Sequence, residues 1–118
     1  MQYAILIYGN EQAMMSADKA STEAVIGAYR AYTDAVQQAG ILVGSNRLRP
    51  SQAATTVRIA EGKSQVLNGP YADTKEQLGG YYIIDVADLD AAIAWGSRCP
   101  GAQYGTIEVR PIWEMTDY

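Results

Sequence analysis

Short apolar runs alternate along the chain with longer runs that have a helical period. Residues 2–8 (QYAILIY) and 80–86 (GYYIIDV) are rich in aromatic and β-branched residues, and both alternating faces of each are apolar. Residues 41–48 and 106–113 also have the composition of strands. A strand with two apolar faces needs cover on both of them. The pattern therefore predicts four strands, of which 2–8 and 80–86 are covered on each side.

Two segments have the 3.6-residue period of amphipathic helices. The first spans residues 22–39, and its apolar stripe consists of Val25, Tyr29, Tyr32, Val36 and Ala39. Ser21 or Thr22 can cap its start, and Gly40 stands where a left-handed residue ends a helix. Asp88 can cap the second helix, which residues 99–101 (Cys-Pro-Gly) stop. The stripe of this second helix consists of Leu89, Ala92, Ile93 and Gly96.

The middle of the chain contains turn signals. Residues 55–60 and 63–67 flank Glu61-Gly62, a two-residue turn that predicts a β-hairpin. In residues 68–80 (NGPYADTKEQLGG), the Gly-Pro pair ends the hairpin ladder. Asp73 or Thr74 can then cap a short helical turn over residues 75–77, which the glycines at 79–80 end. This polar loop beside two glycines has the properties of a binding loop, although many plain surface turns share them.

The element order is strand-helix-strand, hairpin, strand-helix-strand, without a linker. This order predicts one α+β domain over residues 1–118, a ferredoxin-like βαβ-βαβ sandwich with an extra hairpin. Both helices then cover the same face of a mainly antiparallel sheet. The two-faced strands still need cover on the other face. A second copy of the sheet, packed face to face in a twofold homodimer, supplies it.

Composition and charge exclude several kinds of site. The 118 residues include no His and one Cys, Cys99, so Ser-His-Asp triads, imidazole-based metal sites, Cys₄ clusters and internal disulfides are excluded. We expect no cofactor and no metal. The net charge is -4, and the basic residues are scattered, which argues against nucleic-acid binding. The amino terminus has no basic segment, and its apolar run, residues 3–8, is too short for a signal peptide or a membrane span, so we expect a cytoplasmic protein.

Several stretches together resemble the YCII-related family, in its branch with an Asp-Gly-Pro-Phe signature. They are NGPYADTKEQLGG, YYIIDVADLDAAIAW, TIEVRPIW, QYAILIYGNE, AGILVGSNRLRP and TTVRIAEGK, and they cover almost the whole chain. The resemblance implies a ferredoxin-like fold and a dimeric α/β barrel. It also implies a polar cleft at the sheet and dimer interface that serves as a small-molecule site.

The resemblance gives no single activity. Some relatives are thought to transfer protons with a His-Asp pair, including a dehydrochlorinase of a hydroxylated aromatic ring. Others are associated with sigma factors of the extracytoplasmic type, which suggests a regulatory role. This chain has no His, and Asn68 and Tyr71 replace the signature Asp and Phe. The His-Asp pair is therefore absent, and whether the protein is an enzyme stays open.

The remaining polar residues supply the candidate site. Glu108 and Asp73 are the candidate proton acceptors, and the candidate ligand-binding residues are Asn68, Tyr71, Lys75, Glu76 and Arg110. Glu108 and Arg110 share one face of a strand, where Arg110 could hold a substrate carboxylate. They could equally be a plain structural pair.

Other candidates have a structural alternative as well. Asn68 could orient a ligand or hold its own turn. Tyr71, Tyr81 and Tyr82 could line a pocket for an aromatic or amphipathic ligand, or fill an interface. The leading hypothesis is a homodimer that binds a small molecule in an interface cleft, with its transformation left open. The alternative is a non-enzymatic regulatory or protein-interaction module, for example one associated with a sigma factor.

Overall fold

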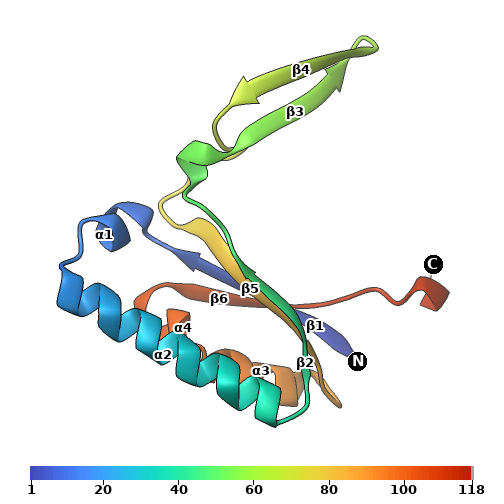
Figure 1. The fold of residues 1–118 in the computed structure, drawn as a ribbon. Coiled ribbons are helices and arrows are strands. Elements are labelled where there is room, and N and C mark those ends of the chain that lie inside the picture. The colour runs from blue at the N-terminus through green and yellow to red at the C-terminus, as the bar shows by residue number, and fades with distance from the viewer. Residues whose placement is uncertain (118) are drawn as a thin grey trace.

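The protein is described by a computed structural model that covers residues 1–117 (Figure 1). Its strands are β1 (Gln2–Gly9), β2 (Leu42–Arg47), β3 (Thr55–Ala60), β4 (Lys63–Asn68), β5 (Gln77–Asp85) and β6 (Thr106–Pro111). Its α-helices are α1 (Glu11–Met15), α2 (Lys19–Gln38), α3 (Leu89–Arg98) and α4 (Gly101–Tyr104). The 3₁₀ turns are η1 (Ser51–Ala53) and η2 (Met115–Asp117). Residue 118 of the predicted domain lies outside the described residues.

The main sheet has the strand order β2-β5-β1-β6, and each neighbouring pair is antiparallel. Ile5 at its centre lies opposite Tyr82 on one side and Val109 on the other. Helices α2 and α3 pack on one face of this sheet (Figure 1). The mixed α+β architecture is confirmed, and it is compatible with the predicted ferredoxin-like sandwich. Among residues 1–117, no helix has both the length and the apolar character to cross a membrane.

The core lies between the sheet and the two long helices. Its buried members are Tyr3, Ile5, Tyr32, Val36, Tyr82, Ile84, Ala92 and Cys99. The ring of Tyr32 meets that of Tyr82 edge-on, with centroids 5.1 Å apart, and its hydroxyl donates to the Trp95 carbonyl over 2.8 Å. The Tyr82 hydroxyl bonds to Thr33 over 2.7 Å. Tyr82, predicted to line a pocket or fill an interface, therefore belongs to the core of the single chain.

Helix α2 begins three residues before its predicted start. The Asp18 carboxylate, rather than Ser21 or Thr22, caps it by accepting from the Ser21 backbone N–H over 2.7 Å. This hydrogen bond lowers the pKa of Asp18. The first turn of the helix is exposed and polar, so the apolar pattern of the sequence does not reveal it. Gly40 at the other end has a φ of 73°, as predicted for a left-handed residue.

The predicted helical turn over residues 75–77 is wrong, because β5 already begins at Gln77. Gln77 and Leu78 pair with the end of β1, opposite Gly9 and Tyr8. Ahead of the strand, the Gln77 side-chain amide donates to the Thr74 carbonyl over 2.5 Å. Gly80 stays extended inside the sheet, where an added Cβ would lie 2.8 Å from the Asn46 carbonyl oxygen. The sheet therefore favours strand over the local helix signal.

The β3–β4 hairpin, hereafter the arm, has the predicted turn. Glu61 and Gly62 have φ values of 52° and 77°, as a two-residue turn matched to strand twist requires. The arm leaves the main sheet on the side away from α2 and α3 (Figure 1). At its base, the Glu11 carboxylate accepts from the backbone N–H and hydroxyl of Ser51 over 2.7 and 2.6 Å. These bonds fix the base of the arm to the body.

We expect the free energy of unfolding to fall as the pH rises past about 10. Burial raises the pKa of Tyr29 and of Tyr32 well above their ordinary value of 10.0. The unfolded chain then releases protons that the folded chain keeps, and this favours unfolding by at most about 1.4 kcal/mol per pH unit for each tyrosine. Urea unfolding between about pH 9 and pH 11 measures the slope. Tyr29→Phe should reduce it, whereas Tyr104→Phe, at an exposed ring, should not; equal slopes in all three proteins would contradict this.

Candidate functional site

The face of the main sheet opposite the helices, hereafter the open face, has an apolar centre. One row of paired residues crosses all four strands of this sheet: Asn46, Tyr81, Leu6 and Glu108. In the next row, Ala4 lies between Ile83 and Arg110. Leu6, Ile83 and Tyr81 are half-buried rather than covered. The open face therefore carries apolar side chains on β1 and β5 and polar ones at its two edges.

Charged residues gather at the β6 edge of the open face. Glu108 accepts from the Tyr8 hydroxyl over 3.4 Å and pairs with the Arg110 guanidinium over 3.0 Å. Two residues earlier on β6, about 7 Å away along a strand, the Thr106 hydroxyl donates to the Glu76 carboxylate over 2.7 Å. These five residues form a group that we call the charged edge. Three of its members, Glu76, Glu108 and Arg110, are residues that the sequence singled out.

The charged edge can both bind an anion and accept a proton. The Arg110 side chain is 66% exposed, and one ion pair with Glu108 leaves most of its five N–H donors available. Glu108 and Glu76 are carboxylate acceptors, and Tyr8 adds a hydroxyl that touches Glu108. A carboxylate ligand on Arg110 would thus lie beside a potential general base, with apolar side chains next to it. In the single chain, the Arg110 guanidinium and the Glu108 carboxylate pair with each other.

Asn68 and Tyr71 lie elsewhere, at the base of the arm. They line a depression of about 310 Å³ together with Thr56, Arg58, Gln65 and Leu67. The Tyr71 ring is 79% exposed and lies 5.9 Å from the Arg58 guanidinium. Glu108 is not among the residues that line this depression. The candidate residues therefore form two separate groups in one chain.

The turn after β4 is held by backbone and threonine contacts. The Gly69 N–H donates to the Ala54 carbonyl over 2.7 Å, and the Thr56 hydroxyl donates to the Gly69 carbonyl over 2.8 Å. Asn68 itself makes no side-chain hydrogen bond among the described residues. Asp73 and Lys75 are exposed in the following loop and have no ion-pair partner there. These polar side chains are therefore available to a ligand or a partner.

Sequence reasoning missed Tyr8, Glu11 and Ser51. Thr106 had a signal, because it alternates with Glu108 and Arg110 on one strand face. Tyr8 reaches Glu108 only through the β1–β6 register, which the sequence does not reveal. Glu11 and Ser51 lie 40 positions apart in the chain, and only the fold brings them into contact.

Cys99 is the one cysteine of the chain. Cys99 is a free, buried thiol, and burial raises its pKa. A thiol of that kind is a poor nucleophile. Among residues 1–117, no three Cys, Asp or Glu side chains gather in a way that could hold a metal ion.

Comparison with known proteins identifies the family to which this chain is similar. A family model described as the YCII-related domain matches residues 1–116. An uncharacterised protein of Rhizobium meliloti (strain 1021) is 39% identical over 114 residues, which make up 95% of this chain and 92% of that protein. The match includes both the open face and the arm.

Proposed function

The chain belongs to the YCII-related family, and we propose that it works as a homodimer that binds a small molecule in a cleft between two sheets. The observation that carries the proposal is the open face, which combines an apolar centre with the charged edge. A specific protein interface has the same plan, an apolar core with a polar rim. Packing two open faces together would cover Leu6, Ile83 and Tyr81 of each chain and complete a dimeric α/β barrel.

The charged edge defines the class of ligand. Arg110 offers donors for a carboxylate, and the neighbouring apolar side chains suit an aromatic or aliphatic body. We therefore propose a small aromatic or amphipathic carboxylate as the ligand. Glu108 is the group positioned to take a proton from it, and the proposal assigns no reaction.

Two further inferences accompany this proposal. The sequence Asn-Gly-Pro-Tyr at residues 68–71 supports membership of the branch with the Asp-Gly-Pro-Phe signature. The free thiol of Cys99 is in keeping with a reducing compartment, which supports a cytoplasmic location.

The proposal is tested by sedimentation and by ligand-induced thermal stabilisation. We expect the mass of two chains, and a rise in Tm with 4-hydroxybenzoate, benzoate or phenylacetate. Arg110→Met should weaken the apparent affinity for the stabilising probe about tenfold or more, because a charge-assisted hydrogen bond is lost. Arg30→Met, at an exposed arginine of α2, is the matched control and should bind like the wild type.

Three results would overturn the proposal or part of it. The mass of a single chain would remove the dimer. No stabilisation by any of the three carboxylates would remove the ligand class. If Arg110→Met and Glu108→Gln lower stability without altering the response to the probe, the pair is only structural.

A further inference from the structure

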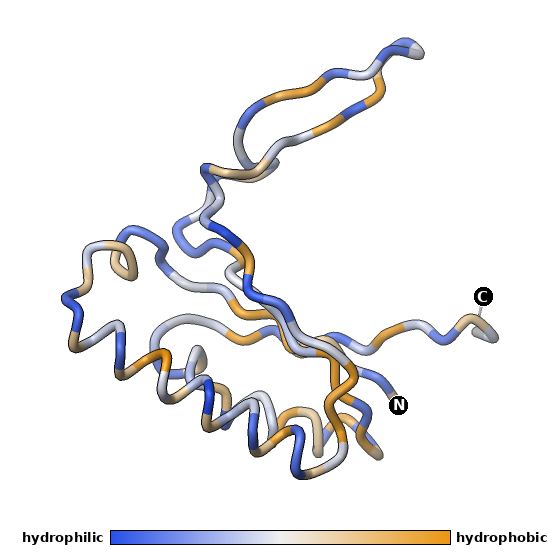
Figure 2. Tube along the Cα trace, in the orientation of Figure 1, coloured by the Kyte–Doolittle hydropathy of each residue, from blue (hydrophilic) through white to orange (hydrophobic). Residues whose placement is uncertain are grey.

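The arm exposes an apolar face that nothing else in residues 1–117 covers. Val57 lies opposite Val66, and Ile59 follows on the same face. These three side chains, hereafter the apolar arm face, are 62%, 60% and 64% exposed, respectively. Figure 2 shows hydrophobic stretches on both strands of the arm. A two-stranded ribbon alone is marginally stable in water, so this face is suited to packing against a surface.

The charges of the arm and of the body have opposite signs. The arm, residues 55–68, contains one acidic residue, Glu61, and two basic ones, Arg58 and Lys63. The rest of the chain contains seven basic and twelve acidic residues. Neither Arg58 nor Lys63 forms an ion pair within the described part of the chain. A second copy of this protein therefore offers the arm a surface of complementary charge.

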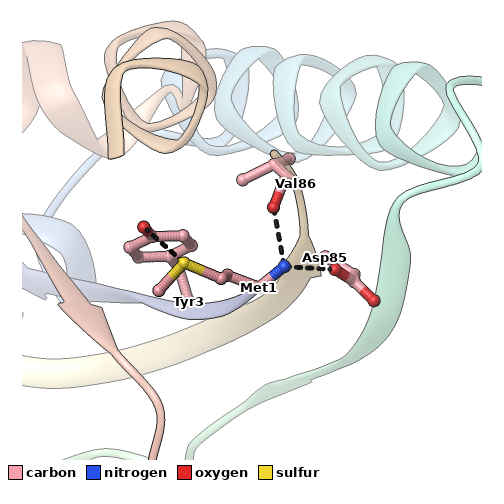
Figure 3. Close-up of polar contacts among 4 residues, drawn as sticks. All are labelled: Met1, Tyr3, Asp85 and Val86. Carbon is pink, nitrogen blue, oxygen red and sulfur yellow. Dashed lines mark hydrogen bonds and ion pairs between the residues drawn. The ribbon is translucent and has the colours of Figure 1, made fainter. Parts of the chain in front are cut away.

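An apolar groove lies at the end of the main sheet remote from the arm. Its volume is about 350 Å³, and the residues that line it include Gln2, Asp85, Ile112, Trp113, Glu114 and Met115. Trp113 and Met115 are 67% and 79% exposed. Asp85 also binds the N-terminal ammonium of Met1 over 3.0 Å (Figure 3). Glu114 adds a second carboxylate to the lining. This terminal groove thus combines exposed apolar side chains with acidic ones, as a partner for the arm requires.

The register places arm and groove at opposite ends of the main sheet. Gly9 and Gln77 pair at the arm end, whereas Gln2 and Asp85 pair at the groove end. When two open faces pack with the twofold axis across the strands, the arm end of each copy lies over the groove end of the other. Each arm strand has six residues and spans about 20 Å. The arm also leaves the sheet on the open-face side, so it points toward the partner (Figure 1).

We propose that the arm of each protomer lies in the terminal groove of its partner, with the apolar arm face against Trp113 and Met115. This placement rests on the proposed homodimer and determines its arrangement, because only one of the possible twofold axes brings arm and groove together. It also makes the exposed apolar residues of both segments part of one interface.

Cross-linking between separately tagged chains tests this placement. One chain carries Ile59→Cys and the other Met115→Cys, and the mixture is allowed to exchange before mild oxidation. Cys99 is 1% exposed and does not compete. A disulfide requires Cα atoms within about 7 Å of each other, so we expect a covalent heterodimer at a yield at least about tenfold above the control pair. The control pair is Ile59→Cys with Ile93→Cys, an exposed isoleucine of α3.

The outcomes separate this placement from the proposed function. A single-chain mass in sedimentation would overturn both. A two-chain mass without the Ile59–Met115 cross-link would overturn the arm placement and leave the proposed dimer in place. Disulfides between two Ile59→Cys chains would also overturn it, because the arms would then meet each other. A two-chain mass together with an Ile59→Cys thiol that stays fully reactive toward a thiol reagent would also overturn the placement. The apolar arm face would then pack against a different protein.

Discussion

Ile5→Ala lowers the free energy of unfolding by about 2–5 kcal/mol. Ile5 is fully buried on β1, between Tyr82 and Val109, on the face that α2 and α3 cover. The substitution removes the transfer free energy of three carbons and leaves a cavity, because the two neighbouring strands are held by their hydrogen bonds. Urea unfolding of both proteins at one fixed chain concentration measures the difference.

The matched control for this prediction is Ile93→Ala. Ile93 is 47% exposed on α3, although the sequence pattern placed it on the apolar stripe of that helix. Its truncation removes the same carbons but leaves no enclosed cavity, so its cost should be less than half that of Ile5→Ala. Equal losses at the two positions would contradict the core described above.

The strands and both long helices could be predicted because their signals are local. The hairpin turn at Glu61-Gly62 and the cap at Asp88 each depend on residues next to each other in the chain. The predicted helical turn over residues 75–77 does not form, because Gln77 pairs with Gly9 of β1, a partner about 70 positions away. Trp95 lies off the stripe of Leu89 and Ile93, yet it packs on Tyr32. Of the predicted stripe, Ala92 and Gly96 are buried, whereas Leu89 and Ile93 are about half-exposed.

The site could be predicted only in part. The alternation of Thr106, Glu108 and Arg110 places three members of the charged edge on one strand face. Their partners Tyr8 and Glu76 arrive from β1 and from the loop before β5, which requires the register of the sheet. Asn68 and Tyr71 looked like part of the same site because residues 68–80 form one dense motif. In the fold, the two ends of that motif lie apart, one on the arm and the other in the main sheet.

Leu6→Asp should convert the proposed homodimer into a monomer at concentrations at which we expect the wild type to be associated. Leu6 lies at the centre of the open face, between Tyr81 and Glu108. Because a twofold interface is self-complementary, the substitution places two new carboxylates in it, each of them beside Glu108. Burying an unpaired charge costs several kcal/mol, so the dimer dissociation constant should rise at least about a hundredfold. Sedimentation velocity over a range of chain concentrations measures it.

Comparison with Ile5 makes this prediction decisive, because the two residues are neighbours on β1 with opposite orientations. Ile5→Ala acts on the fold of each chain, whereas Leu6→Asp acts on a surface that the single chain leaves half-exposed. The Leu6→Asp monomer should therefore keep cooperative unfolding, with a smaller loss of stability than Ile5→Ala. Ile93→Asp, which adds the same charge on α3, should leave the dimer intact. If Leu6→Asp still sediments as two chains, the open face does not form the dimer interface, and the cleft proposed there has no second wall.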